Sequence, residues 1–136
     1  MNERGTGRKK ALRRNRIADY TLRIDYMNQD KCCSVILVDF LHEKIAVVNK
    51  TTDPLLKAFG MKVNPDWEDF RGFLEERCIP RERYQIKQVL KDIGVDGYDP
   101  LAILEKTQGR TGEDEMWLKF SYYRAAEETI DVSDKI

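Results

Sequence analysis

The sequence is poor in the residues that build metal centres and disulfide frameworks. It has one histidine, His42, and three cysteines, Cys32, Cys33 and Cys78, in 136 residues. The number of cysteines is odd, two of them are adjacent, and none has the spacing of a zinc site or of a C-x-x-C redox motif. We therefore expect three reduced thiols, no metal site and no cofactor.

Long apolar runs are lacking as well. No stretch approaches the roughly 20 apolar residues that a membrane helix needs, and no apolar region follows the basic N-terminus as it would in a secretory signal. We expect a cytoplasmic protein without membrane contact. The chain is 41% hydrophobic and 35% charged, which is typical of a globular protein, and its length suits one domain with an ordinary core.

The formal net charge is zero, but the charge is unevenly distributed. Residues 1–16 carry a net +6, which leaves −6 for the rest of the chain. A basic arm on an acidic body is typical of proteins that contact nucleic acid or an acidic surface. We expect a disordered arm over 1–16, one domain over 17–126 and an acidic frayed tail over 127–136. The basic residues of the arm are Arg4, Arg8, Lys9, Lys10, Arg13, Arg14 and Arg16.

Alternation of apolar and polar residues predicts β-strands in the first half of the chain. Residues 20–27 have this period of two, and a turn signal follows at 28–30. β-Branched residues are frequent over 33–40 and 44–49, with a short hairpin connection between them. We expect an antiparallel sheet here, and a last strand over 116–120 that could join its edge.

After residue 53 the apolar period becomes helical. It predicts one helical turn over 55–59 and then three helices. The first has Asn64-Pro65 at its start and ends before Pro80, the second runs from Ile86 to Gly94, and the third from Pro100 to Gly109. The predicted fold class is α+β: a small antiparallel β-sheet of three to four strands packed with a bundle of three to four short helices.

No pattern in the sequence predicts catalysis. His42 lies in a predicted turn and has no nucleophile or orienting partner near it in the sequence, so we expect an exposed loop histidine rather than a general base. The segments Gly5–Gly7 and Gly109–Gly112 match neither the phosphate-loop nor the dinucleotide-binding pattern. We expect a protein that is not an enzyme.

Three arginines, Arg77, Arg81 and Arg83, lie on both sides of Pro80. One interpretation is an arginine cluster that binds a phosphate group or an acidic partner. The other interpretation, which we favour, is structural: Arg77 and Arg83 form ion pairs with the acidic loop around Asp114. The two interpretations predict different consequences of substitution, because a structural arginine affects stability and a binding arginine affects the partner.

The aromatic residues divide into expected core and expected surface. Trp67 and Trp117 each begin a periodic apolar pattern, so we expect both in the core. Tyr122 and Tyr123, next to Arg124, are better candidates for an exposed contact.

One longer pattern resembles a known family. An Arg-x-x-Pro-x-x-Arg motif precedes an amphipathic helix, a glycine, a short helix, a second glycine and a closing Asp-x-x-Trp; its residues are Arg77, Pro80, Arg83, Gly94, Gly109, Asp114 and Trp117. The pattern resembles the segment ahead of the kinase domain in HipA-related proteins of Gram-positive bacteria, and is similar to short stand-alone proteins encoded beside such kinases. The likeness covers about residues 33–120.

The resemblance implies a regulatory or accessory role. HipA-type kinases are toxins of toxin–antitoxin systems, and their small partners act by binding. This chain has no nucleotide loop and no catalytic Asp-x-x-x-x-Asn set, so ATP binding and phosphotransfer do not carry over. The basic arm lies outside the resemblance.

Two functional hypotheses follow. The first is a non-catalytic interaction protein of a mobile-element system that docks on a protein partner such as a HipA-like kinase. The second is a phage-encoded, nucleic-acid-directed regulator, or an inhibitor of a host nucleic-acid enzyme such as a CRISPR nuclease, in an anti-defence role. The basic arm favours the second hypothesis, and the family resemblance favours the first.

Overall fold

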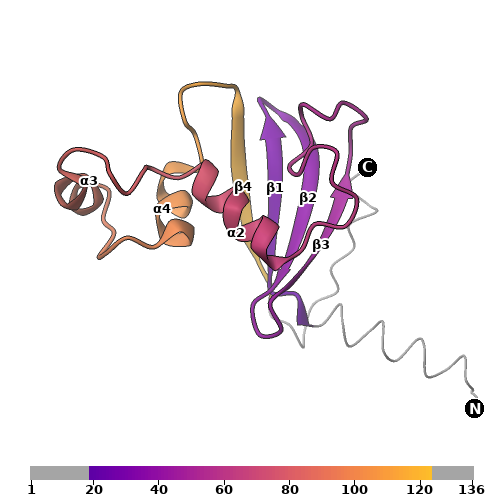
Figure 1. Cartoon of the computed structure of the whole chain (residues 1–136), viewed down its shortest axis with the longest axis horizontal. Coiled ribbons are helices and arrows are strands. Elements are labelled where there is room, and N and C mark those ends of the chain that lie inside the picture. Colours follow the sequence, from indigo (N-terminus) through magenta and orange to yellow (C-terminus); the bar gives the residue numbers. More distant parts are fainter. Residues whose placement is uncertain (1–18, 124–136) are drawn as a thin grey trace, which may run out of the picture.

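A computed structural model describes residues 19–123 (Figure 1). Four strands form one antiparallel sheet in the order β3-β2-β1-β4. This confirms the α+β class and the expected place of the last strand at the sheet edge. The elements in chain order are β1 (Leu22–Asn28), β2 (Lys31–Asp39), β3 (Lys44–Asn49), α2 (Trp67–Glu76), α3 (Ile86–Asp92), α4 (Pro100–Thr107) and β4 (Met116–Tyr122).

α2 runs across one face of the sheet, α4 lies beside β4, and α3 lies farther out on that same side, away from the sheet (Figure 1). That face and α2 supply most of the core because every second residue of each strand points the same way. Full burial of one such aliphatic or aromatic side chain contributes about 1.5–3 kcal/mol. The almost fully buried side chains of the core include Leu22, Ile24, Ile36, Val38, Phe70, Ile103, Leu104 and Leu118.

The start of α2 differs from the predicted one. The N-cap is Asp66 rather than Asn64, and Trp67 rather than Pro65 is the first helical residue. Asp66 accepts a hydrogen bond from the Asp69 amide, and the Asp69 carboxylate accepts one from the Asp66 amide, both at 2.9 Å. This reciprocal box satisfies two amides that the helix itself leaves unpaired, which a cap at Asn64 could not do.

The predicted helical turn over 55–59 is wrong. The chain makes successive turns there instead of a helix. Its residue Leu55 is 88% exposed, whereas Leu56 and Phe59 pack against the core. Leu56 and Phe59 therefore hold this segment against the core without a helix.

The second face of the sheet has a smaller apolar cluster. Val35 and Leu37 are buried there, with Tyr20 and Tyr123 packed against them. Beside them, the Arg23 guanidinium donates to the Asp25 carboxylate at 2.7 Å. None of the helices within residues 19–123 is long and apolar enough to cross a membrane.

Candidate functional site

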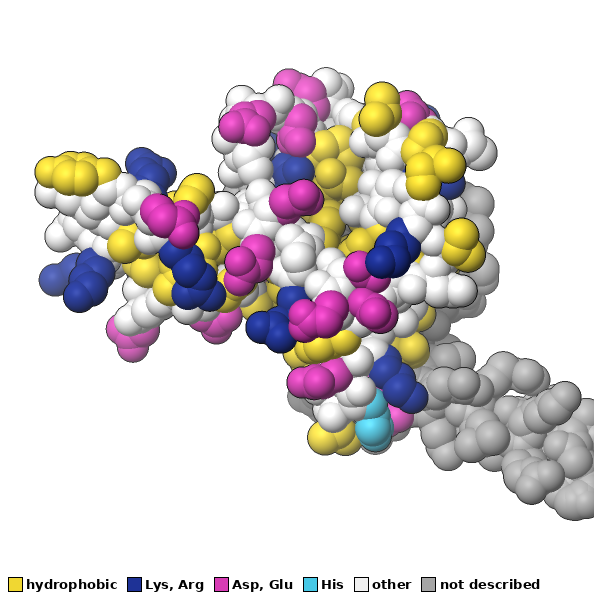
Figure 2. Space-filling model, in the orientation of Figure 1, with side chains coloured by type: hydrophobic (Ala, Val, Ile, Leu, Met, Phe, Trp, Pro, Cys, Tyr) yellow, Lys and Arg dark blue, Asp and Glu magenta, His cyan; other side chains and the backbone are white. Residues whose placement is uncertain are grey.

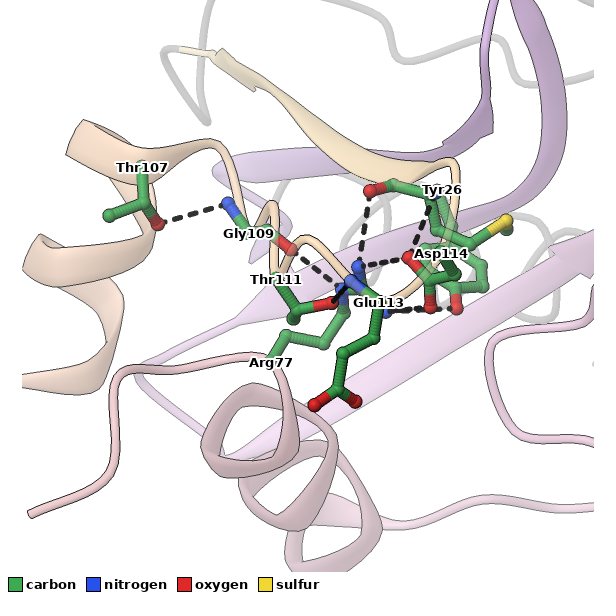
Figure 3. A network of polar contacts seen from close by, with 8 residues as sticks. Tyr26, Arg77, Thr107, Gly109, Thr111, Glu113 and Asp114 are labelled. Carbon is green, nitrogen blue, oxygen red and sulfur yellow. Dashed lines mark hydrogen bonds and ion pairs between the residues drawn. The ribbon is translucent and has the colours of Figure 1, made fainter. Parts of the chain in front are cut away.

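Arg77 occupies the end of α2 and is almost fully buried, with 8% of its surface exposed. Its Nε donates to the Gly109 carbonyl at 2.9 Å, and its Nη2 donates to the Met116 carbonyl at 3.1 Å. Both Nη atoms donate to the Asp114 carboxylate, at 3.0 and 3.2 Å (Figure 3). The ion pair predicted between Arg77 and the Asp114 loop is therefore present. We call this group of residues 77, 109, 114 and 116 the Arg77 corner.

The backbone conformation at Gly109 allows these hydrogen bonds of the Arg77 guanidinium. Gly109 has φ +64°, and a Cβ there would lie 2.8 Å from Cγ of Leu118. Only glycine therefore brings its carbonyl to the guanidinium without a clash. The hydrogen bonds from Arg77 are the main reason that the pKa of Asp114 lies below its ordinary value. All of these bonds join parts of the same chain, so the corner holds the loop before β4 against α2.

Arg83 does not join the corner, so that part of the structural interpretation is wrong. Its side chain is exposed and, within residues 19–123, makes no ion pair with Asp114. The Arg83 amide instead donates to the Pro80 carbonyl at 3.1 Å. The chain turns after Pro80 and carries Arg83 away from the end of α2.

Trp117 is also placed differently from the prediction. It is half-buried, on the face of the sheet opposite to the core, because its neighbours Met116 and Leu118 are the buried residues of β4. Its indole donates to the Gln29 carbonyl at 2.6 Å, and the Arg110 guanidinium lies 4.9 Å from its ring centre. Trp67, by contrast, packs against the core as expected.

A hollow opens beside α3, the helix that lies at the end of the molecule farthest from β3 (Figure 1). Its volume is about 580 Å³. Its apolar lining comes from both turns of α3 and from the segment after it: Ile86, Leu90, Val95 and Tyr98. Its charged lining is mainly basic: Arg81, Lys87 and Lys91, with Asp96 as the one acid. We call this site the α3 hollow.

One wall of the α3 hollow is fixed by Tyr98. Its hydroxyl donates to the Ile79 carbonyl, and the Arg81 guanidinium stacks 4.1 Å from its ring centre. Burial is the main cause of the raised pKa of Tyr98, so the phenol is neutral at physiological pH. Arg81 also lies 3.5 Å from Glu75. The wall is therefore held in place, whereas the Lys87 and Lys91 ammonium groups form no ion pair within residues 19–123.

The sequence contained part of the signal for this hollow. Ile86 and Leu90 lie one helical turn apart, and so do Lys87 and Lys91, which places a basic stripe next to an apolar one. Figure 2 shows basic side chains around this end of the molecule. The sequence did not reveal that Val95 and Tyr98 fold back to form the other side.

His42 has closer partners than predicted. Its Nδ1 lies 2.8 Å from Asp39 and 3.6 Å from Asp19, and its amide donates to Asp39 at 3.1 Å. Within residues 19–123 this is the one group of three potential metal-ligating side chains whose ligand atoms lie within 4.8 Å of one another. The bonds between Asp39 and His42 close the β2–β3 hairpin. The His42 side chain is 48% exposed, as expected for a loop residue.

The three cysteines differ in burial. Cys33 and Cys78 are buried, Cys32 is half-buried, and all three are free. Burial raises the pKa of each thiol above its ordinary value, which keeps the unreactive protonated form at physiological pH.

The remaining predicted contact residues fall into two groups. Tyr122 is 56% exposed, as expected, while Tyr123 packs against the second face of the sheet. The basic residues of the arm, 4–16, lie outside the described part of the chain. No protein-family model, no curated protein and no solved structure matches this chain.

Proposed function

We propose that this chain is a non-catalytic interaction protein that docks on a protein partner through the α3 hollow. The observation that carries the proposal is that the α3 hollow combines an apolar lining, which we call its floor, with basic side chains around it, which we call its rim. Apolar floors bind through the burial of side chains from a partner. A rim of Lys87, Lys91 and Arg81 selects an acidic surface and steers its approach.

A HipA-like kinase is the partner that the family resemblance supports. The resemblance runs through Arg77 and Asp114, which pair in the Arg77 corner, and through Pro80, after which the chain continues into the segment that contains α3 (the α3 segment). The protein would then be an accessory component of a toxin–antitoxin system on a mobile element. In this proposal the α3 hollow supplies the contact with the kinase.

The basic arm favours a second function, which is direction to nucleic acid. Its seven basic residues over 1–16 can neutralise phosphates and release counterions, so that binding weakens steeply with salt. An anti-defence inhibitor or a phage regulator would use such an arm. This function and the docking function use different parts of the chain, so deletion of residues 1–16 separates them.

Binding to a purified HipA-like kinase tests the docking function. The double variant Lys87→Glu/Lys91→Glu should weaken the affinity at least about tenfold, because two rim charges become repulsive toward an acidic surface. A matched control is Lys31→Glu/Lys57→Glu, which makes the same charge change away from α3. No binding by the wild-type protein would exclude the kinase as partner, and an equal loss in both double variants would exclude the α3 hollow as the site.

A further inference from the structure

Two carboxylates and one imidazole meet where the β2–β3 hairpin turns, beside the segment that enters β1. Asp39 is the last residue of β2, His42 lies in the connection 40–43, and Asp19 precedes β1. Nδ1 of His42 lies 2.8 Å from Oδ2 of Asp39 and 3.6 Å from Oδ2 of Asp19. The three ligand atoms all lie within 4.8 Å of one another. We call these residues the hairpin triad.

The pairing of β1 with β2 brings the triad together, although Asp19 is far from the other two residues in sequence. The Thr21 amide donates to the Val38 carbonyl at 3.1 Å, so the residues before β1 lie beside the end of β2 (Figure 1). The His42 amide donates to Oδ1 of Asp39 at 3.1 Å, and Oδ2 of the same carboxylate lies against the imidazole. The backbone of the hairpin therefore orients the Asp39 carboxylate toward His42.

The negative charges of the triad lack a lysine or arginine partner within residues 19–123. The Asp39 side chain is only 6% exposed, and a carboxylate buried to this extent is normally paired with a cation. The lysines and arginines that form ion pairs in this part of the chain do so with other acids. Nδ1 of His42 carries at most one proton, and at 3.6 Å it is too far from Asp19 for a hydrogen bond. The triad therefore holds two carboxylates and one nitrogen that satisfies only the first of them.

The spacing of the triad suits a small divalent cation. Zn²⁺ binds imidazole nitrogen and carboxylate oxygen at about 2.0–2.2 Å, which places neighbouring ligand atoms of a tetrahedral site about 3.4 Å apart. The distances from Nδ1 to the two carboxylates, 2.8 and 3.6 Å, lie on either side of this value. The side chains of His42 and Asp19 are 48% and 37% exposed, so an ion can reach them from solvent and both can adjust to it.

We propose that Asp19, Asp39 and His42 form a binding site for a divalent transition-metal ion of the zinc class. The two carboxylates cancel the charge of the ion, and the neutral imidazole supplies the nitrogen that Zn²⁺ accepts and that Mg²⁺ and Ca²⁺ do not prefer. The expectation of no metal site rested on the single histidine, but one histidine is enough where carboxylates supply the other ligands. The triad shares no residue with the α3 hollow, so the site is independent of the proposed docking function.

Proton NMR of the imidazole tests the site directly. His42 is the only histidine of the chain, so the full-length protein without a histidine tag gives one set of imidazole resonances. Addition of Zn²⁺ at neutral pH should shift these resonances, with one ion bound per chain. Resonances that do not move up to about 1 mM Zn²⁺, where binding of any biological use would be complete, would overturn the proposal. The imidazole would then serve only to close the hairpin.

Ligand variants give the matched comparison by isothermal titration calorimetry. Asp19→Asn and His42→Gln should each weaken Zn²⁺ binding at least about tenfold, because even the loss of a residue that only orients a ligand costs about 10- to 100-fold. Both side chains are partly exposed, and an unchanged melting temperature in the absence of zinc shows that the variants are folded. Asp30→Asn is the control, because it neutralises an exposed acid in the β1–β2 turn. An equal loss in this control would overturn the proposal in favour of general binding to acidic groups.

Cobalt distinguishes the triad from the thiols as the ligands. Co²⁺ bound by nitrogen and oxygen has only weak visible absorption bands, whereas a thiolate ligand adds an intense charge-transfer band in the near ultraviolet. Cys32 is the least buried of the three cysteines and is the competing ligand to consider. We expect the weak bands alone, and their loss in His42→Gln. A charge-transfer band that persists in His42→Gln would overturn the proposal, because a cysteine would then hold the ion.

Discussion

Arg77 and Arg83 lie six residues apart in one motif, yet their surroundings are opposite. Arg77 is buried and bonded to Asp114, Gly109 and Met116, whereas Arg83 is exposed beyond Pro80. The Arg-x-x-Pro-x-x-Arg motif therefore joins a packed region before Pro80 to an exposed region after it. Residues up to Pro80 anchor the loop before β4, and residues after it form a segment whose charged side chains face solvent.

Gly109 and Gly94, one in each region, differ in how closely other side chains surround them. Gly109 in the Arg77 corner has φ +64° and lies against Leu118, so it combines a required backbone conformation with a required absence of a side chain. Gly94, which follows α3, has φ +84° but only the flexible end of Lys106 near it, at 3.9 Å. The corner is tightly packed, and the α3 segment tolerates more change.

The largest effect that this comparison predicts is that of Arg77→Ala. It removes the guanidinium that bonds the Gly109 and Met116 carbonyls and the Asp114 carboxylate, so the free energy of unfolding should fall by about 3–4 kcal/mol. Arg83→Ala is the matched control and should change it by less than about 0.5 kcal/mol. Urea denaturation at neutral pH measures both. Similar losses in the two variants would show that the corner and the α3 segment are not energetically distinct.

Substitution of the two glycines should follow the same order. Gly109→Ala requires a strained φ and places a Cβ 2.8 Å from Leu118, so we expect a loss of about 2–3 kcal/mol. Gly94→Ala has the strained φ alone, and we expect about 1 kcal/mol. Thermal melting of both variants compares them. A larger loss at Gly94 would contradict the packing difference.

The smallest stability effect concerns Asp114 and depends on pH. Hydrogen bonds from Arg77 hold the pKa of Asp114 in the folded protein below its value of about 4 in the unfolded chain. The charged carboxylate therefore makes its full contribution to the free energy of unfolding above about pH 4. This contribution disappears as the pH falls through the folded-state pKa. The Asp114 side chain is 43% exposed, and solvent screening limits the contribution to about 1 kcal/mol. Asp114→Asn should therefore be less stable than wild type at pH 7, and the difference should shrink as the pH falls through the folded-state pKa of Asp114. A difference that persists in acid would assign the effect to packing instead of charge.

The sequence was sufficient to predict the strands and the longer helices, because burial on one face imposes a period that can be counted. It predicted β3 at Lys44–Asn49 with the observed bounds. It failed at the start of α2, where Asn64 and Asp66 are both good N-caps by residue type and only the reciprocal bonds with Asp69 decide between them.

The candidate sites were less predictable from sequence because they depend on the path of the chain. The ion pair of Arg77 with Asp114 was predicted, since both residues belong to conspicuous charged clusters. The direction of Arg83 after Pro80 was not, because a proline fixes one dihedral angle and not the path that follows. Half of the α3 hollow, formed by Val95 and Tyr98, depends on the turn at Gly94 and could not be read from helical spacing.

The proposed docking on a protein partner places the contact at the α3 hollow and leaves the Arg77 corner outside it. Backbone amide NMR shifts of the labelled full-length protein, recorded as a purified HipA-like kinase is added, locate the contact residue by residue. We expect the largest changes at Ile86–Lys91 and Val95–Tyr98, with little change at Arg77, Gly109 and Asp114. Changes concentrated at the corner or on the second face of the sheet, with none around α3, would contradict it.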